Sequence, residues 1–428
     1  MESFHKLFFY LGRKLRNPNV MHWYWFLKES ESWDRQQLSE YQTEQCRKLL
    51  IFARDYSPFW KKRFEDHGLV PENFSSIEEL QKLPPITKQD LIQNNDTIQS
   101  NYPFKKLFYS ETSGSTGEPL SFHRNEKWDS LNRAAMWRGY SWFNIHPWER
   151  SGYLWGYSFN RKEKIKSLFL DWLQNRFRLF TYEENEILSF LRKLKKAQYL
   201  EGYASMIYEL AKTAEKKGFQ DFTNLTFIKG TSEKIFNSYQ SLSQKIFNKK
   251  IVSEYGAVES GIIAFECPQG NMHINMEQVI VEEMDNEIVV TNLHSLSFPI
   301  IRYKLGDYIE LKNEGCSCGM KHPLIRNIIG RVGKRIYGRK KIYPSITLYY
   351  IFKNLLINHR LTINYKAIQH HEGHIIIHIE QDIDLHQQGL VKKEAIKYFG
   401  DDLKIQIKTN HYLHTYQEKK KDFISMVE

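Results

Sequence analysis

The chain has 428 residues, of which 41% are hydrophobic and 14% aromatic, and its formal net charge is +11. A single hydrophobic core stops growing at about 250–300 residues, so this length predicts more than one domain, and the apolar content excludes an intrinsically disordered chain. The excess of Lys and Arg favours anionic partners such as nucleotides. Because the basic residues are scattered along the sequence, we do not expect a nucleic-acid-binding protein.

The N-terminal segment, Phe4–Phe26, is the first predicted element and is both basic and aromatic. Its apolar run is too short for a signal peptide, and the sequence has no stretch of about 18 apolar residues that could span a membrane. We therefore expect a cytoplasmic protein whose N-terminal helix packs against the rest of the fold. Contact of this segment with an anionic membrane surface is the less favoured alternative.

The middle of the chain changes from helices to strands. Residues 127–225 alternate helical runs, such as FLRKLKKAQYLEGYASMIYELAKTAEKKG, with short apolar strands, such as SGYLWGYSF. Strands then predominate up to the basic segment GRVGKRIYGRK, and shorter helices and strands follow it. The pattern predicts an α/β fold with a large multilayer N-terminal domain, residues 1–330, a hinge at about 331–341, and a small α+β C-terminal domain, residues 331–428.

The stretch SETSGSTGEPL, residues 110–120, lies between two aromatic segments. Its glycines allow positive φ angles and its hydroxyl groups add donors, so the loop could surround a phosphate. The phosphate-binding candidates are Thr112, Ser113, Gly114, Ser115, Thr116 and Gly117. Glu118 and Pro119 stand where a Walker A loop continues with Lys and Ser or Thr, which excludes an ordinary P-loop; a plain loop is the alternative.

Four cysteines are too few for a disulfide scaffold in a chain of this length. Cys46 lies in a helical pattern and is expected in the core, whereas the other three lie in the turn-rich segments FECPQGNMHIN and NEGCSCGMKHP. The candidate zinc ligands are Cys267, His273, Cys316 and Cys318. Three thiolates and one imidazole would form a closed tetrahedral site that stabilises the fold. Free thiols, or His322 in place of His273, are the alternatives.

Five segments occur in a defined order along the chain, and together they are a more specific signal than any one of them alone: SETSGSTGEPL, EYGAVES, RYKLGD, GRVGKRI and YQEKKKDFIS. In order and spacing they resemble the motifs of the adenylate-forming enzymes. The segments IFARDYSPFWKKRF, PPITKQDL and KGTSEKI, with the C-x-C-G pair, are similar to the branch of the phenylacetate–CoA ligases, CapK and the coenzyme F390 synthetases. The resemblance covers nearly the whole chain and implies a large adenylation domain with a mobile C-terminal cap.

The resemblance implies a role for each matching residue. Glu259 would hold Mg²⁺, Asp307 would accept hydrogen bonds from both ribose hydroxyls, and Arg331 would lie near the ribose and phosphate. The residues that would border the adenine are Gly230, Thr231, Glu233, Tyr255 and Gly256. Lys419 matches the lysine placed between the attacking carboxylate and the α-phosphate, and the adjacent Lys420 is the alternative.

The implied activity is ATP-dependent adenylation of a carboxylic acid with release of pyrophosphate, followed by transfer of the acyl group to a thiol, such as that of coenzyme A, or to an amine. The likeness to CapK suggests a role in a capsular or surface polysaccharide, and a homodimer is compatible with it. AMP transfer to a hydroxyl, and nucleotide binding without turnover, are the alternatives. Tyr153, Trp155 and Tyr157 alternate along a strand-like run and, with Tyr203, could line a pocket for an aromatic acid; core packing explains them equally well.

Overall fold

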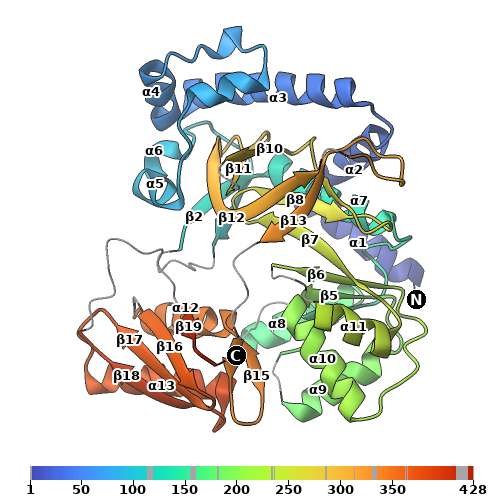
Figure 1. Ribbon diagram of the computed structural model, residues 1–428, viewed down its shortest axis with the longest axis vertical. Coiled ribbons are helices and arrows are strands. Elements are labelled where there is room, and N and C mark those ends of the chain that lie inside the picture. The colour runs from blue at the N-terminus through green and yellow to red at the C-terminus, as the bar shows by residue number, and fades with distance from the viewer. Residues whose placement is uncertain are drawn as a thin grey trace. The chain divides into compact units, whose positions relative to one another are not determined.

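The structure is a computed structural model of the chain, drawn in Figure 1. It describes residues 2–112, 119–154, 161–180, 183–232, 235, 237–284, 287–312, 314–329, 335–361, 363, 365–410 and 423–427. The chain divides into two compact units. The first unit comprises Met1–Glu111, Ser121–Leu179 and Leu188–Arg331, and the second comprises Thr112–Leu120, Phe180–Ile187 and Val332–Glu428.

The helices of the first half of the chain are α1 (Glu2–Arg16), α2 (Val20–Ser30), α3 (Arg35–Tyr56), α4 (Pro58–Asp66), the 3₁₀ helices η1 (Pro71–Asn73) and η2 (Ile77–Lys82), α5 (Lys88–Gln93), α6 (Asn95–Ile98), α7 (Glu126–Ser141) and α8 (Arg161–Leu173). The later helices are α9 (Glu184–Leu194), α10 (Ala204–Lys216), α11 (Asn237–Phe247), α12 (Ile346–His359) and α13 (Leu385–Phe399).

The strands of the first unit are β1 (Leu107–Glu111), β2 (Ser121–Asn125), β3 (Ser151–Leu154), β4 (Arg176–Arg178), β5 (Tyr199–Tyr203), β6 (Phe227–Thr231), β7 (Ile251–Ala257), β8 (Gly261–Glu266), β9 (Met272–Ile274), β10 (Val279–Met284), β11 (Glu287–Asn292), β12 (Tyr303–Lys312) and β13 (Leu324–Ile329). Those of the second unit are β14 (Arg335–Tyr337), β15 (Ile342–Pro344), β16 (Tyr365–His371), β17 (His374–Ile379), β18 (Lys404–Lys408) and β19 (Phe423–Ser425).

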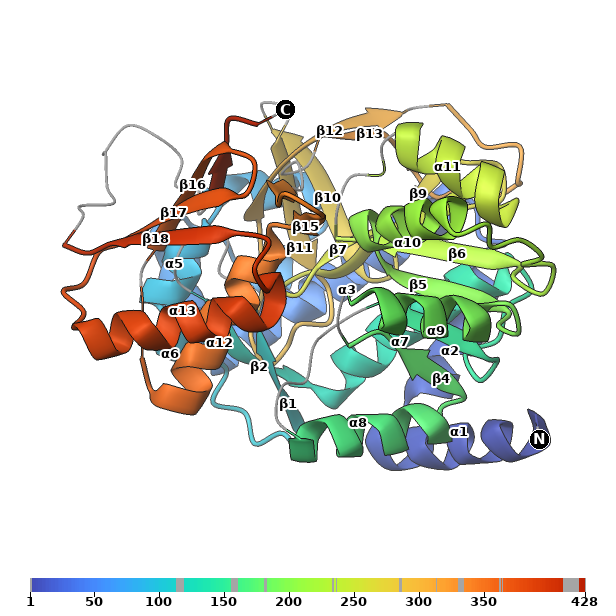
Figure 2. The same cartoon turned by 90° about the horizontal axis from the view of Figure 1, so that it is seen from below.

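An eleven-stranded sheet forms the centre of the first unit, in the order β10-β11-β12-β13-β9-β8-β7-β6-β5-β3-β4. Strands β4, β3, β5, β6 and β7 are parallel, and the pairs from β7 to β10 are antiparallel. Helices α10 and α11 cover one face of the parallel strands and α7 lies on the other (Figure 2). The predicted α/β fold is confirmed, and the parallel strands are buried on both faces because crossover helices cover them.

The N-terminal helices pack against α7. Phe9 of α1, Leu27 of α2 and Trp137 of α7 belong to one buried apolar cluster. The N-terminal segment is therefore a packed helix pair, as expected. Among the described residues, no helix combines the length and the hydropathy that crossing a bilayer requires.

One predicted helical run, FLRKLKKAQYLEGYASMIYELAKTAEKKG, is wrong in its middle. Strand β5 separates α9 from α10 there, because residues Tyr199–Tyr203 pair with β3 and β6. Gly202 permits this close pairing, since a Cβ atom at this position would lie 2.4 Å from the Cβ atom of Leu154. A short buried parallel strand lacks the alternating polarity that would have distinguished it from a helix.

The second unit has its own sheet and core. Four strands lie in the order β18-β17-β16-β19, and α12 and α13 supply apolar side chains to the same cluster. Ile351 and Leu355 of α12 and Val391 of α13 are fully buried in it together with Ile375 and Ile377 of β17. Burial of these side chains explains why the C-terminal segment forms a separate compact unit.

Candidate functional site

The predicted adenine-bordering residues lie at the carboxyl ends of two neighbouring parallel strands. Gly230 and Thr231 end β6, and Tyr255 and Gly256 lie in β7. The backbone of Thr231 pairs with that of Glu254, which directly precedes Tyr255. Carboxyl ends of parallel strands are the usual place for ligands in open α/β sheets. Glu233 lies outside the described residues.

Position 256 requires glycine because the backbone of the adjacent strand β8 lies too close for a side chain. A Cβ atom at this position would lie 2.3 Å from the carbonyl oxygen of Gly261 in the adjacent strand β8. The turn between β7 and β8 carries Glu259. A side chain at position 256 would push β8 away and displace this turn.

Two tyrosine hydroxyls hold the two predicted carboxylates. Tyr255 Oη donates a hydrogen bond to Asp307 Oδ2 at 2.9 Å, which joins β7 to β12. Tyr303 Oη donates to Glu259 Oε1 at 3.2 Å, and both of these side chains are buried. The structure thus connects Tyr255 to Asp307 and Glu259 to Tyr303, pairs that are 52 and 44 residues apart in sequence.

The predicted phosphate loop is described only at its ends. The backbone N–H of Thr112 donates to the carbonyl oxygen of Leu120 at 2.9 Å, and the N–H of Leu120 donates to Thr112 Oγ1 at 3.0 Å. These bonds close the base of a loop. The predicted residues that lie outside the described part of the chain are Ser113, Gly114, Ser115, Thr116, Gly117, Arg331, Lys419 and Lys420.

A cavity of about 260 Å³ lies in the first unit among the parallel strands, α1 and α7. Its lining includes Thr231 and Glu254, so the cavity reaches the strand ends that carry the predicted nucleotide residues. The lining also includes Tyr153, Glu201 and Lys229. Their backbones pair in one row across β3, β5 and β6, which places the three side chains on one face of the sheet.

Lys229 is shared by two carboxylates in this cavity. Its Nζ atom lies 3.1 Å from Glu201 Oε2 and 3.0 Å from Glu254 Oε2, and Tyr140 Oη also donates to Glu201. Burial opposes the charged form of Lys229, but Glu254 and Glu201 outweigh burial and raise its pKa. Burial likewise opposes the charged form of Glu201, but Lys229 outweighs it and lowers the pKa of that carboxyl. Lys229 and Glu201 are therefore charged at neutral pH.

The α1 side of the cavity has an excess of positive charge. Arg133 pairs with Asp129 at 2.9 Å and Arg176 pairs with Asp171 at 2.6 Å. Among the described residues, Arg13 has no carboxylate in ion-pair contact, and its guanidinium lies over the ring of Trp137, 5.7 Å from the centroid. Burial, and then repulsion from Arg133 and other arginines, lowers the pKa of Arg13 to about 9. An anionic group in the cavity would complement Arg13.

Sequence reasoning missed this polar cluster. The signal was the charge inside two otherwise apolar strands, YLEGY and FIKGT. A Glu or Lys in the middle of a buried parallel strand needs a partner or a ligand. Of the residues predicted for an acid pocket, Tyr153 lines the cavity, Tyr203 is buried elsewhere, and Trp155 and Tyr157 lie outside the described residues.

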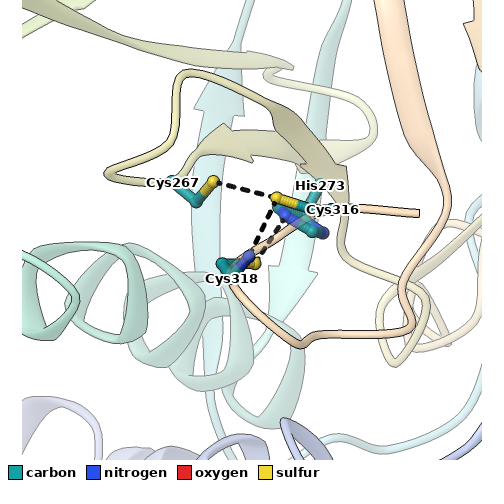
Figure 3. Close-up of side chains that lie close together, drawn as sticks. All are labelled: Cys267, His273, Cys316 and Cys318. Carbon is teal, nitrogen blue, oxygen red and sulfur yellow. Dashed lines mark hydrogen bonds between the residues drawn. The ribbon is translucent and has the colours of Figure 1, made fainter. Parts of the chain in front are cut away.

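The four predicted zinc ligands come together (Figure 3). Cys267 and His273 flank the turn between β8 and β9, and the C-x-C pair lies in the loop between β12 and β13. Their ligand atoms all lie within 4.8 Å of one another. Cys267 Sγ is 3.7 Å from Cys316 Sγ, and Cys318 Sγ is 3.2 Å from His273 Nε2. Pairing of β9 with β13 brings the two segments to the same place.

The alternative ligand, His322, has a different partner. Its Nε2 atom lies 2.8 Å from Glu277 Oε1, a buried carboxylate that also pairs with Arg138 at 2.6 Å. Burial lowers the pKa of His273 to about 4, which keeps its imidazole neutral and able to bind a cation. The residues present therefore fit a tetrahedral zinc ion with His273 as the fourth ligand.

Comparisons with known proteins agree with the motifs. No protein-family model matches the chain. CapK of Staphylococcus aureus is 23% identical over 393 residues, which cover 88% of this chain and 85% of CapK. A phenylacetate–coenzyme A ligase of Thermus thermophilus is 20% identical over 350 residues, 74% of this chain and 76% of the ligase.

The fold matches that of a solved ligase. The structure of 2-hydroxyisobutyryl-CoA ligase in complex with 2-HIB-AMP and CoA has a TM-score of 0.66 and 16% sequence identity, and covers 93% of this chain and 91% of the ligase. A structure of the same ligase in the postadenylation state has a TM-score of 0.61. The chain thus shares the fold of this CoA ligase and is similar over most of its length to CapK and to a phenylacetate–CoA ligase.

Proposed function

We propose that the protein is an AMP-forming ligase that activates a carboxylic acid with ATP and transfers the acyl group to the thiol of coenzyme A or to an amine. The observation that carries this proposal is the hydrogen bond that joins Tyr255 of β7 to Asp307 of β12, together with the bond from Tyr303 of β12 to Glu259 in the turn after β7. Tyr255 fixes one oxygen of Asp307, so that the carboxylate is held in place to accept hydrogen bonds from a ribose. The solved 2-hydroxyisobutyryl-CoA ligase, of the same fold, binds an acyl-AMP and CoA.

The reaction has two steps. An oxygen of the substrate carboxylate attacks the α-phosphorus of ATP, and the bond to pyrophosphate breaks. The acceptor then adds to the carbonyl carbon of the acyl-AMP, and the bond to AMP breaks. Lys419 would stabilise the negative charge that develops at phosphorus in the first step. Glu259, oriented by Tyr303, would hold Mg²⁺, which neutralises phosphate charge when bound.

The same proposal gives the C-terminal unit a mechanical role. Residues 331–428 would act as a cap, hinged at about 331–341, that brings Lys419 to the acid for the first step. Withdrawal of the lysine would then open the carbonyl carbon to the acceptor. The loop from Thr112 to Gly117 would hold the pyrophosphate.

The cavity indicates the kind of acid. Thr231 and Glu254 line it, and so do Lys229, Glu201 and Arg13, which lacks an ion-pair partner among the described residues. Lys229 and Glu201 compensate each other, but a plain aromatic ring would leave the buried Arg13 without an ionic partner. We therefore propose a polar acid whose remote end carries a second anionic group or several hydroxyls, such as a uronic acid. Such an acid also suits a role in a surface polysaccharide, as the similarity to CapK suggests.

The Cys/His cluster supports a structural zinc ion in this enzyme. The residues that would hold it are Cys267, His273, Cys316 and Cys318. The ion would connect the β8–β9 turn to the loop before β13. It would stabilise the fold and take no part in the reaction. We also expect the enzyme to act in the cytoplasm, where ATP is available.

Pyrophosphate release from ATP tests the proposal. We expect release with uronic or dicarboxylic acids to exceed that with phenylacetate. We expect Arg13→Gln to raise KM for the preferred acid about tenfold, the effect of losing one charge-assisted contact, while Arg16→Gln on the exposed side of α1 leaves it unchanged. Discharge of the adenylate by CoA would identify a thiol acceptor, whereas AMP left on a hydroxyl would support the alternative reaction.

The outcomes separate the parts of the proposal. ATP binding without pyrophosphate release from any acid would overturn the ligase activity. Fast pyrophosphate release with phenylacetate, unaffected by Arg13→Gln, would contradict only the proposal that the substrate is a polar acid.

A further inference from the structure

Helices α1 and α8 lie side by side at the edge of the first unit (Figure 2). The ring of Phe4 in α1 is 5.9 Å from the ring of Trp172 in α8, measured between centroids, and His5 Nδ1 is 3.4 Å from the carbonyl oxygen of Leu173. These contacts fix the two helices as one surface.

Both helices turn an apolar stripe outward. Of the 22 large hydrophobic side chains that are exposed among the described residues, ten belong to α1 and α8. These ten are Phe4, Leu7, Phe8, Leu11 and Leu15 of α1, and Ile165, Leu168, Phe169, Leu170 and Trp172 of α8, which we call the outer apolar face. Such a concentration exceeds the scattered single exposures that a soluble surface normally carries.

The helical spacing shows that this exposure is built into the sequence. In α8 the positions 165, 168, 169 and 172 follow one helix face, and they are exposed by 49–59%. The same helix buries its acid, Asp171, which binds Arg176 at 2.6 Å and Arg178 at 2.9 Å. A surface helix normally turns its apolar side toward the core. Helix α8 does the opposite, because its apolar side faces outward and its buried acid faces the protein.

Among the described side chains, the exposed charges beside the outer apolar face are positive. Five exposed cations belong to the two helices: Lys6, Lys14, Arg16, Lys162 and Lys166. Among the described side chains of α1 and α8 the one acid is the buried Asp171. An apolar helix face flanked by exposed cations is the pattern of a helix that lies in the interface of an anionic membrane.

We propose that the outer apolar face of α1 and α8 docks on a membrane surface that contains anionic phospholipid. Phe169 and Trp172 would enter the interface between headgroups and acyl chains, and Lys162 and Lys166 would contact the lipid phosphates. A second copy of the chain is disfavoured as occupant, because a symmetric dimer through this face would bring like charges together. The inference is independent of the proposed reaction.

Flotation of the full-length protein with lipid vesicles tests this inference. We expect binding to vesicles of phosphatidylcholine with phosphatidylglycerol, weaker binding to phosphatidylcholine alone, and loss of binding as salt is raised. The double variants Phe169→Ser/Trp172→Ser and Lys162→Gln/Lys166→Gln should each reduce the bound fraction at least fivefold. Leu385→Ser/Ile396→Ser, which changes two exposed apolar residues of α13, is the control and should bind like wild type.

Circular dichroism establishes that each variant is folded. Absence of binding to anionic vesicles, or equal binding by all variants, would overturn the inference. A dimer that Phe169→Ser/Trp172→Ser converts to a monomer, without vesicle binding by wild type, would instead assign the face to a second copy of the chain.

Discussion

Two buried glutamates share one lysine at the centre of the parallel strands. Glu201 and Glu254 both contact Lys229, whose side chain is 4% exposed. A buried charge cluster of this kind costs desolvation energy, and apolar residues would stabilise the strands better. The cluster lies in the wall of the cavity, and the proposed binding of a polar acid would give a physical reason for it.

Replacement of this lysine tests the charge cluster. Lys229→Met should destabilise the protein by about 3–5 kcal/mol at neutral pH, because two buried carboxylates lose their cation. Lys245→Met, which removes an exposed pair with Glu215, should change stability by less than about 0.5 kcal/mol. Denaturant unfolding, followed by fluorescence, measures both.

The destabilisation caused by Lys229→Met should depend on pH. Lys229 lowers the folded-state pKa of Glu201, so this contribution to stability is present above the unfolded pKa of about 4.3 and is lost as pH falls through the lower folded value. In the variant, burial without Lys229 raises that pKa instead. The destabilisation should therefore shrink as pH falls from 7 through the unfolded pKa of about 4.3. A difference that is independent of pH would contradict the charged state of the cluster.

At the scale of elements, the β8–β9 turn and the β12–β13 loop meet at the Cys/His cluster. Among the described residues of the two segments, no large apolar side chain is buried, and Cys316 and Cys318 are partly exposed. Burial lowers the pKa of His273, while the pKa of Cys318 is raised to about 12 by burial and by the neighbouring thiols. A bound cation would stabilise the thiolates and so hold the two segments together.

Metal analysis of the purified protein tests this junction. We expect about one zinc per chain in wild type, and loss of most of the zinc in Cys318→Ser. Cys46→Ser, at a buried position in α3, is the matched control and should retain zinc. The unfolding temperature should fall in Cys318→Ser and in wild type treated with a chelator. Stoichiometric zinc in Cys316→Ser would remove that cysteine from the site.

At the scale of the whole molecule, order along the chain was the most informative property of the sequence. The segments EYGAVES and RYKLGD are short, but their order predicted the family, and the fold places Tyr255 against Asp307. The C-x-C spacing alone could not select the fourth ligand, because the two histidines are distinguished by their contacts in the fold: His273 lies beside Cys318, whereas His322 contacts Glu277. Strand β5 and the polar cavity escaped prediction, since both depend on contacts between strands and not on local pattern.

The two faces of α1 illustrate the same limit. Periodicity predicted an amphipathic helix, but the sequence could not decide which side faced the protein. The structure buries Phe9 against Trp137 and exposes Phe8 and Leu11. Helix α1 can therefore pack against the protein with one face and present the other to a membrane, although the sequence alone set these roles as alternatives.

The central claim is that this chain forms an acyl-adenylate and that a lysine near its C-terminus takes part. Single-turnover formation of acyl-AMP, with the acid that gives the fastest pyrophosphate release, measures it directly. We expect Lys419→Ala to lower the rate of adenylate formation by at least about a hundredfold, the usual effect of removing one electrostatic group from a transition state, with ATP binding unchanged. Lys421→Ala, in the same basic run, should react like wild type. Adenylate formation at the wild-type rate in both Lys419→Ala and Lys420→Ala would contradict the account.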